Sequence, residues 1–528
     1  MCKGWESYGI GGYNHAMKFG PADYRIYYDC MEYDNHSIPG KSIRQQRLCL
    51  ARSVDGVVWK KPSCNGPVHG CGVVGGAHMS GSNILAWCSM VSVFEDLNPS
   101  TQPSGRYKML CNKKAYESPD GLLWTHVSND TKPTIAHADD TQDSGWFDPA
   151  IGKYVIYVRR DLDIAGRNCS DKFMSGPNSC RLVGRCETSD LNDWEQGNPE
   201  GCPAVFGPDA EDPMGIDLYT SGFAQYEGVQ LFFPAAMYTF GASFPWGYGN
   251  DGILDIRFAA SRDGKEIRYV PGAANAREPW FELGLNRCGS HASAPDSYRG
   301  GWCDPGSEDQ KSHTDPHTTT NYMTGGLMES PTGEEVFLYV GSPNTIGHGE
   351  VFTEPPVYPG PPSTLPPWRP PLSPPTGGIS LLRVRKHGFV AVEGPSRPLL
   401  PLANTTGCRP KDYPSATGPS EIYPGFTTVP LEMPDNCSGH LVLAVNAKTS
   451  VAGFVQIGIV SQANSTDYTR YRLCNSDPLR GNFLAATASW GGGSARTLPP
   501  TAGGGSVQLE VILVAAKLFS LQFQCMAI

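Results

Sequence analysis

A short phrase that recurs along the chain constrains its fold more than any other feature. The phrase reads Ser-x-Asp-Gly and occurs at 53–56, 118–121 and 261–264, with Trp three residues later in the first two copies and a degenerate copy at 188–194. Asp-Gly is typical of hairpin turns, because glycine accepts the positive φ that such turns need. Each copy follows an alternating apolar run, so each predicts a strand, a tight turn and a further strand.

A second phrase, an aromatic-rich strand after a turn, accompanies each unit of the chain. Its copies lie at 24–28, 106–110, 153–157, 229–233 and 335–339. The two phrases alternate in a fixed order and define five units of roughly 50–75 residues, as expected of radially repeated four-stranded sheets. We therefore predict an all-β protein whose main part is a five-bladed β-propeller. Stacked β-sandwiches, the alternative, would not explain the fixed order.

The domain boundaries follow from shifts in composition. We expect the propeller to span 1–395, with a Cys/Gly/His-rich insertion at about 285–317 and a Pro-rich surface loop at 354–376. Beyond about 420, apolar strands alternate with Gly, Ser and Asp turns. This pattern predicts a C-terminal β-sandwich at 420–528.

Cysteines and glycosylation sequons indicate the compartment. Seventeen cysteines are scattered without zinc-binding spacing, and Asn-x-Ser/Thr sequons begin at Asn35, Asn129, Asn168, Asn404, Asn436 and Asn464. We expect a glycoprotein with disulfide bonds, located outside the cell or in the lumen of the secretory pathway. No signal peptide follows Met1, so we expect the N-terminus to be incomplete. No apolar run is long enough to predict a membrane span.

Charge and metal-ligand patterns exclude several classes of partner. The net charge is −10, and no run of Lys and Arg exceeds three residues, which disfavours nucleic acid and leaves carbohydrate as the expected partner. His313 and His317 flank Asp315, but their spacing is more typical of a solvated loop than of a metal site. We expect neither a metal nor a cofactor, and the sequence leaves the oligomeric state open.

Residues 143–157 and 184–194 resemble a blade of the five-bladed glycosidases, the invertase, levansucrase and arabinanase-like superfamily of glycoside hydrolase families 32, 43 and 68. The segments 217–220 and 378–389 are similar to uncharacterised family 32-like proteins. The resemblance implies hydrolysis of a glycosidic bond in an oligo- or polysaccharide within the axial funnel. However, the Asn-Asp-Pro-Asn-Gly motif of family 32 is absent, and the first-blade segment 11–15 has no acid. A non-catalytic carbohydrate-binding propeller is therefore the alternative, and a sialidase-like propeller is a second rival.

Glycoside cleavage needs two carboxyl groups. Counting back from the first turn of each unit predicts that Asp143, Asp217 and Asp96 begin inner strands and converge in the funnel as catalytic residues. Each also has a structural interpretation. Asp143 could cap a turn, Asp217 could hydrogen-bond to a neighbouring blade, and Asp96 could belong to a plain turn.

A second group of residues is predicted to bind the substrate. Asp148, Arg159, Trp146, Tyr219 and Glu187 could contact sugar hydroxyls or stack on sugar faces, as could the aromatic residues Phe240, Trp246 and Tyr248. The structural alternatives are an Asp-Pro turn, a salt bridge between blades, core packing for the aromatic rings and an outer-strand position for the glutamate.

Overall fold

The computed structural model describes residues 9–38, 41–64, 71–73, 82–112, 114–127, 143–163, 179–194, 198, 200–213, 216–239, 252–270, 277–281, 321–342, 378–395, 425–434, 437–461, 466–498 and 506–526. This part of the chain is nearly all β and divides into two compact units. The first comprises 1–332 and 336–383, and the second comprises 333–335 and 384–528. Among the described residues, no helix is long and apolar enough to cross a membrane.

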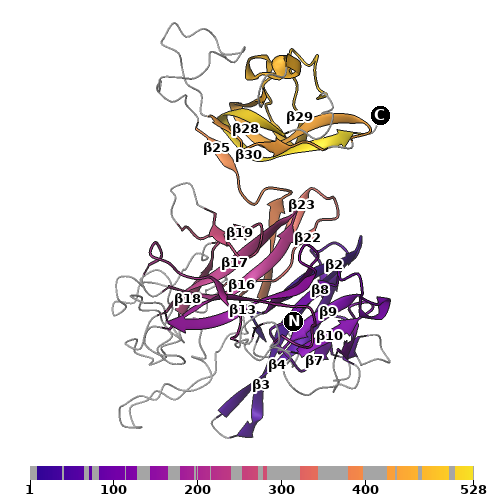
Figure 1. Ribbon diagram of the computed structural model, residues 1–528. Coiled ribbons are helices and arrows are strands. Elements are labelled where there is room, and N and C mark those ends of the chain that lie inside the picture. The colour runs from indigo at the N-terminus through magenta and orange to yellow at the C-terminus, as the bar shows by residue number, and fades with distance from the viewer. Residues whose placement is uncertain are drawn as a thin grey trace. The chain divides into compact units, whose positions relative to one another are not determined.

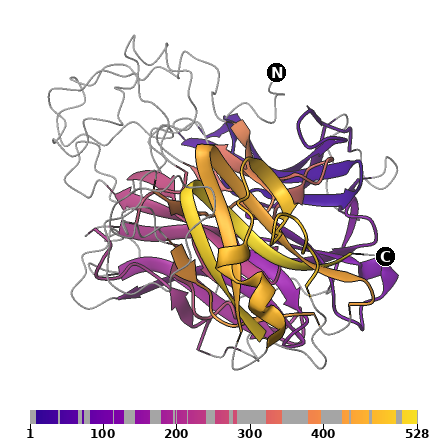
Figure 2. The same cartoon turned by 90° about the horizontal axis from the view of Figure 1, so that it is seen from above.

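Among the described residues, five sheets form the first unit, and they follow one another in chain order apart from one short strand of the second sheet, which precedes the last strand of the first. The first contains β1 (Gly9–Ile10), β2 (His15–Gly20), β3 (Asp23–Ile38), β4 (Lys41–Ser53), β5 (Trp59–Lys60) and β7 (Ile84–Ala86). The second contains β6 (Gly72–Val73), β8 (Ser92–Glu95), β9 (Tyr107–Cys111), β10 (Lys114–Ser118) and β11 (Leu123–His126). The indigo and purple strands of these two sheets lie on one side of the unit, and the magenta strands of later sheets lie on the other (Figures 1 and 2).

The remaining sheets of this unit are built mainly from antiparallel strand pairs. The third contains β12 (Ser144–Asp148), β13 (Lys153–Asp163), β14 (Ser179–Thr188) and β15 (Ala204–Phe206). The fourth contains β16 (Ile216–Tyr226), β17 (Val229–Thr239), β18 (Gly252–Ile256), β19 (Ala259–Ser261) and β20 (Arg268–Tyr269). The fifth contains β21 (Tyr322–Met323), β22 (Met328–Glu329), β23 (Glu335–Ser342) and β24 (Gly378–Arg385).

The first strands of successive sheets contact one another. β2 contacts β8, β8 contacts β12, β12 contacts β16, β16 contacts β21, and β22 contacts β2. The link between the last and first sheets includes a bridge between His15 and Gly325. The fifth sheet is therefore a neighbour of the first as well as of the fourth.

The two ends of these first strands differ in their connections. At one end, here called the turn end, short turns at 21–22, 149–152 and 227–228 lead into the second strands. At the other, here called the loop end, long stretches of chain such as 128–142, 164–178, 240–251 and 343–377 join the strands. Long connections on a rigid scaffold are where binding and catalytic groups gather, so the loop end is the first place to look for a site.

The recurring Ser-x-Asp-Gly phrase forms the predicted turn. In the copy at 53–56, Oγ of Ser53 accepts the N–H of Gly56, and Oδ1 of Asp55 accepts the N–H groups of Val57 and Val58. Gly56 has φ +73°, which a side chain would disfavour. The carbonyl of Gly56 accepts the hydroxyl of Tyr339 from the fifth sheet at 2.7 Å.

The same hydrogen bond from a neighbouring sheet recurs at the other copies. Tyr27 donates to the carbonyl of Gly121 at 2.6 Å, and Tyr157 donates to that of Gly264 at 3.2 Å. Trp124, which follows the second copy, is buried and packs edge-on against Tyr27. Each of these turns therefore ties its own sheet to the sheet before it.

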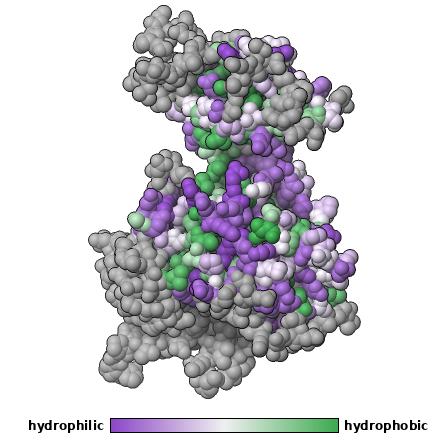
Figure 3. Space-filling model, in the orientation of Figure 1, coloured by the Kyte–Doolittle hydropathy of each residue, from purple (hydrophilic) through white to green (hydrophobic). Residues whose placement is uncertain are grey.

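Apolar side chains fill the spaces between sheets. One core cluster joins residues of the third and fourth sheets, another joins the first and second, and a further one joins the fifth and first. On the face of the first unit seen in Figure 3, hydrophilic residues predominate and hydrophobic ones form small separate groups. Most of the apolar surface of these strands is thus removed from water, which is the main source of their stability.

Every cysteine in the described part of the chain is disulfide-bonded. Five pairs are complete within it, namely Cys30–Cys49, Cys64–Cys71, Cys88–Cys111, Cys186–Cys202 and Cys437–Cys525. Disulfides persist in oxidising compartments, so the bonds agree with the predicted environment. Of the sequons, Asn35 lies on β3, and the others fall outside the described residues.

The second unit contains one six-stranded sheet. Its strands are β25 (Val392–Gly394), β26 (Gly425–Thr427), β27 (Leu431–Glu432), β28 (His440–Ser461), β29 (Asn482–Thr487) and β30 (Ser506–Met526). The two long strands β28 and β30 pair along most of their length, with register shifts that include one between Thr449 and Phe454. Trp490 is buried against this sheet and donates its indole N–H to the carbonyl of Ile457. The β-sandwich remains a prediction, and both the insertion at about 285–317 and the Pro-rich loop at 354–376 lie outside the described residues.

Candidate functional site

Two of the predicted carboxylates lie at the loop end of neighbouring sheets. Asp143 directly precedes β12 and is 2% exposed, and Asp217 is the second residue of β16 and is fully buried. The strands that carry them are tied together, because Oγ of Ser144 donates to the carbonyl of Ser221 at 3.2 Å. The structure therefore brings Asp143 and Asp217 to the same end of adjacent inner strands.

Asp217 is held by the third sheet. Its Oδ1 accepts the backbone N–H of Arg181, on β14, at 3.1 Å. The Arg181 guanidinium, which is 1% exposed, lies 3.7 Å from the sulfur of Met237, the cross-strand partner of Asp217. A buried carboxylate of the fourth sheet and a buried guanidinium of the third sheet thus lie in the same region of the unit.

Three tyrosines from different sheets meet beside this pair, and we call them the tyrosine cluster. The hydroxyls of Tyr13 and Tyr219 are 2.6 Å apart, and the Tyr322 ring lies 5.8 Å from the ring of Tyr13 and 6.1 Å from that of Tyr219. The Arg181 guanidinium stacks on Tyr219 at 4.8 Å. Tyr219 is therefore close to Asp217, but it packs against other side chains.

The first sheet also supplies an acid at the loop end. Asp29, on β3, is fully buried, and its backbone N–H donates to Oδ1 of Asn14. A Cβ at Gly11 would lie 2.6 Å from the Cβ of Asp29 and 3.0 Å from its Oδ2. The missing side chain at Gly11 therefore leaves room for the Asp29 carboxylate against the innermost strand. The first sheet therefore has a buried acid on β3, although its segment 11–15 has none.

Two predicted substrate-binding residues lie near this region and contact other residues of the protein. Arg159 is buried and forms an ion pair with Asp161, two residues along β13, at 3.0 Å. Trp146 belongs to the core between the third and fourth sheets, where its ring lies 5.9 Å from that of Phe223. A cavity of about 10 Å³ lies beside Arg159 and Tyr219, which is room for a single water molecule.

Asp96 and Asp148 lie at the turn end, away from the other candidates. Asp96 follows β8, and its carboxylate accepts hydrogen bonds from the Asn98 N–H and from the hydroxyls of Thr101 and Tyr154. Asp148 ends β12 and accepts the N–H of Ala150. Both carboxylates thus shape turns.

The long turn after β8 explains why the sequence predicted Asp96 at the start of an inner strand, whereas the structure places it at the end of β8. The turn after β8 runs over 96–106, whereas the turn after β12 runs only over 149–152. Counting the same distance back from each turn glycine therefore reaches the start of β12 but only the end of β8. This spacing brings Asp143 to the loop end and leaves Asp96 at the turn end.

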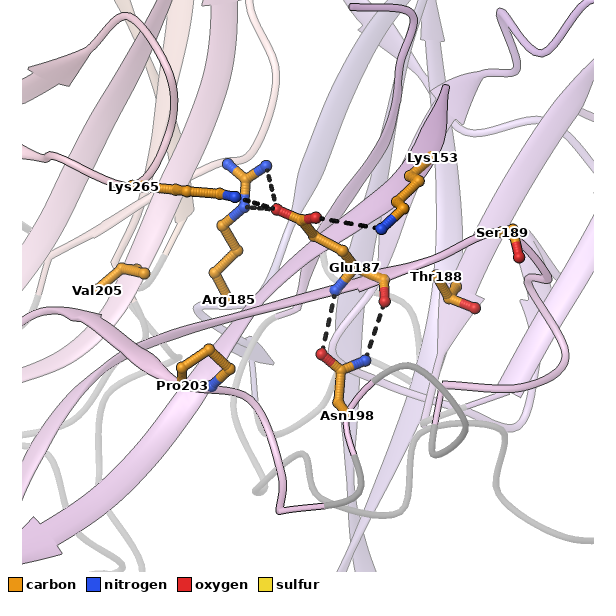
Figure 4. A pocket seen from close by; sticks show the side chains of 9 residues that line it. All are labelled: Lys153, Arg185, Glu187, Thr188, Ser189, Asn198, Pro203, Val205 and Lys265. Carbon is orange, nitrogen blue, oxygen red and sulfur yellow. Dashed lines mark hydrogen bonds and ion pairs between the residues drawn. The ribbon is translucent and has the colours of Figure 1, made fainter. Parts of the chain in front are cut away.

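Glu187 lines a pocket at the turn end, between the third and fourth sheets (Figure 4). Its carboxylate forms ion pairs with Arg185 at 3.0 Å, Lys265 at 3.1 Å and Lys153 at 3.7 Å. Burial raises the pKa of Glu187, but these cations outweigh that effect and hold the pKa below its usual value. Glu187 therefore stays ionised at neutral pH and is a poor proton donor.

Some predicted positions cannot be placed, and others were not foreseen. Phe240, Trp246 and Tyr248, and the segment 313–317, lie outside the described residues. Arg181, Tyr13, Tyr322 and Asp29 were missed. The one signal for Asp29 was an acid within a run at 24–31 that, apart from Arg25, is otherwise apolar and aromatic. Among the described residues, no group of three His, Cys, Asp or Glu could hold a metal ion.

Known proteins resemble this chain in structure and not in sequence. No protein-family model and no curated protein matches the chain. The solved structures that resemble it include a putative glycosidase from Bacteroides thetaiotaomicron, with 15% identity and a TM-score of 0.37 over 65% of this chain and 86% of the other. A thermostable family-43 glycoside hydrolase has 12% identity and a TM-score of 0.35 over 71% and 89%.

A third similar structure is an alpha-L-arabinofuranosidase from Clostridium thermocellum, with 11% identity and a TM-score of 0.31 over 63% and 82% of the two chains. TM-scores below 0.5 are too low to transfer residues or a reaction from these proteins, so the function is argued from the residues of the chain itself. The solved proteins that this chain resembles are glycoside hydrolases, at low identity and low TM-score.

Proposed function

We propose that this protein is a glycoside hydrolase that cleaves a glycosidic bond of an oligo- or polysaccharide at the loop end of its first unit. The observation that carries the proposal is the position of Asp143 and Asp217. Both are buried, and both lie at the same end of adjacent inner strands. Two carboxyl groups on neighbouring elements are what glycoside hydrolysis requires.

The first unit is proposed to be a closed, five-bladed propeller that carries a C-terminal β-sandwich domain. Contacts between the first strands run through all five sheets and return from β22 to β2. The hydrogen bond from Tyr339 to Gly56 supports closure, because it joins the fifth sheet to the first in the same way as Tyr27 and Gly121 join the first to the second. In a closed ring, the loop ends of all five inner strands surround one axis.

The two carboxyl groups are proposed to have different roles. The backbone N–H of Arg181 holds one oxygen of the Asp217 carboxylate in a fixed position, so we assign Asp217 as the base or nucleophile. Asp143 is assigned as the proton donor to the leaving oxygen. Asp29 is proposed as a third acid at this end, where a carboxylate can accept a hydrogen bond from a sugar hydroxyl. The tyrosine cluster closes the site on the side of the first and fifth sheets.

The setting of the reaction is proposed to be an oxidising one. Disulfides such as Cys30–Cys49 and Cys186–Cys202 join strands within the first unit. Such bonds are rare where thiols are kept reduced. We therefore propose that the protein is secreted or resides in the secretory pathway, as a glycoprotein.

The proposal is tested with a panel of furanosides, fructans, arabinans and common pyranosides. Asp143→Asn and Asp217→Asn each keep side-chain volume and one acceptor oxygen but cannot serve as acid or base. We expect a loss of about 10²–10⁴-fold in turnover for each, as is usual when a positioned acid or base is removed. Circular dichroism and the melting temperature check that the variants fold.

Two outcomes would contradict the proposal. Cleavage that survives both substitutions would place the chemistry elsewhere. Retained sugar binding by the wild-type protein, with no cleavage across the panel, would establish the alternative of a non-catalytic carbohydrate-binding propeller.

A further inference from the structure

The turn-end pocket of Figure 4 is large and is lined mainly by cationic and polar side chains. Its volume is about 520 Å³, within the range of roughly 300–1,000 Å³ in which proteins bind small molecules. It is lined by the start of β13, the end of β14, the segment before β15 and the turn after β19. It therefore lies at the opposite end of the strands from Asp143 and Asp217.

The charged groups that line the pocket leave an excess of positive charge. Among the described residues that line it, Lys153, Arg185 and Lys265 are cationic and Glu187 is the one acid, so these residues carry a net charge of +2 (three minus one). The protein as a whole has a net charge of −10. A local positive excess on an acidic protein attracts anions to that place.

The floor of the pocket is rigid. Arg185 is buried, and its guanidinium binds Glu187 while Nη1 donates to the Tyr157 hydroxyl at 2.9 Å and to the carbonyl of Asp263 at 3.0 Å. The disulfide between Cys186 and Cys202 fixes β14 to the segment that leads into β15. The Arg185 guanidinium is therefore occupied by hydrogen bonds within the protein, and it holds the Glu187 carboxylate in place.

The two lysines differ from Arg185 because they reach into the pocket from its rim. The Lys153 side chain is 48% exposed and the Lys265 side chain is 59% exposed, and the ion pair of each is with Glu187. An ammonium group has three N–H donors, so each lysine keeps donors that can turn to a ligand. Figure 4 shows the two side chains approaching Glu187 from opposite sides.

We propose that this pocket binds the anionic group of an acidic sugar, a carboxylate or a sulfate, between Lys153 and Lys265. The volume admits a monosaccharide unit, and the exposed hydroxyl of Ser189 and the two ammonium groups supply donors for an oxyanion. We propose binding without cleavage, since Glu187 is the only carboxylate among the described residues that line the pocket and glycoside cleavage requires two. This site goes beyond the proposed reaction and is independent of it.

Isothermal titration calorimetry at low ionic strength tests the site with D-glucuronate, inorganic sulfate and, as the neutral counterpart, D-glucose. We expect the wild-type protein to bind glucuronate or sulfate but not glucose. The double variant Lys153→Gln/Lys265→Gln removes both charges from exposed positions, and we expect its affinity to fall about tenfold, as for two exposed charge pairs. The matched control is Lys60→Gln, an exposed lysine at the end of β5, which should bind like the wild type.

Comparison of the ligands shows which class of anion the protein binds, and comparison of the variants shows whether the anion binds in this pocket. Binding of glucuronate alone would identify a carboxylate site, and binding of sulfate alone a sulfate site. The proposal is overturned if neither anion binds the wild-type protein, if glucose binds equally well, or if the double variant retains wild-type affinity. Circular dichroism of the double variant excludes misfolding as the cause of a loss.

Discussion

Lowering the pH should destabilise the first unit through one buried residue, His15. This histidine begins β2, is 8% exposed, and forms a backbone bridge with Gly325, next to the fifth sheet. Burial lowers the pKa of His15 from 6.5 to about 3. The ring therefore stays neutral in the folded protein at pH values at which it is already protonated in the unfolded chain.

The sign and size of the effect follow from this difference. Between pH 6.5 and 3 the unfolded state binds one more proton than the folded state, so the free energy of unfolding falls as the pH falls. Each pH unit below 6.5 costs about 1.4 kcal/mol, so the loss from His15 at pH 4.5 is about 3 kcal/mol. A domain with a stability of about 5–15 kcal/mol would lose a large part of it.

Urea denaturation at pH 7.5 and pH 4.5, followed by tryptophan fluorescence, measures this loss. Carboxylates titrate in the same range, so the informative quantity is the difference between the wild type and His15→Gln. We expect the wild type to lose about 3 kcal/mol more than this variant. His440→Gln, at an exposed position in the second unit, should behave like the wild type. Equal losses in the wild type and His15→Gln would refute the reasoning.

Two further predictions concern the turns that join neighbouring sheets. Tyr339→Phe removes the hydroxyl that donates to the Gly56 carbonyl, and we expect a loss of about 1–2 kcal/mol in the free energy of unfolding; an unchanged melting temperature would show that this contact does not help to close the ring. Gly264→Ala combines a φ of +70° with a Cβ that would overlap the hydroxyl of Tyr157, so we expect it to cost at least about 2 kcal/mol. Gly228→Ala shares the backbone conformation, with φ +74°, but has open space around the new Cβ, so it should cost only about 1 kcal/mol; equal losses in the two variants would contradict the packing argument.

The turns could be predicted from the sequence because the hydrogen bonds that form them are local. In Ser-x-Asp-Gly, the serine and aspartate side chains bind N–H groups within three residues, as at Ser118 and Asp120. Such hydrogen bonds depend on the phrase itself, so each copy predicts its own geometry. Ser-x-Asp-Gly, or its degenerate copy, occurs in every sheet of the first unit except the fifth. For the fifth sheet, the aromatic-rich strand at 335–339 was the only repeated feature in the sequence.

The candidate site was predictable only in part because it depends on strand register. Asp143 and Asp96 lie the same number of residues before a turn glycine, yet the longer turn after β8 places Asp96 at the turn end. A difference of a few residues in turn length moves a side chain from one end of a short strand to the other, and the boundaries of strands are hard to read from one sequence.

Contacts between segments far apart in the chain could not be predicted from the sequence for a different reason. Asp29 gains its position from the absent side chain at Gly11, which adjoins it only once β1 and β3 have paired. The meeting of Tyr13, Tyr219 and Tyr322 likewise requires three sheets to assemble. No local pattern in the sequence marks these residues as neighbours.

The rate of glycoside hydrolysis in two matched aspartate variants tests the central claim most directly. Asp217→Asn alters a buried carboxylate at the loop end, whereas Asp190→Asn alters an exposed one that accepts the N–H of Asn192 in a turn at the turn end. The account predicts that Asp217→Asn loses about 10²–10⁴-fold in turnover while Asp190→Asn keeps the wild-type rate. Wild-type turnover in a folded Asp217→Asn protein would contradict the assignment of the reaction to the loop end.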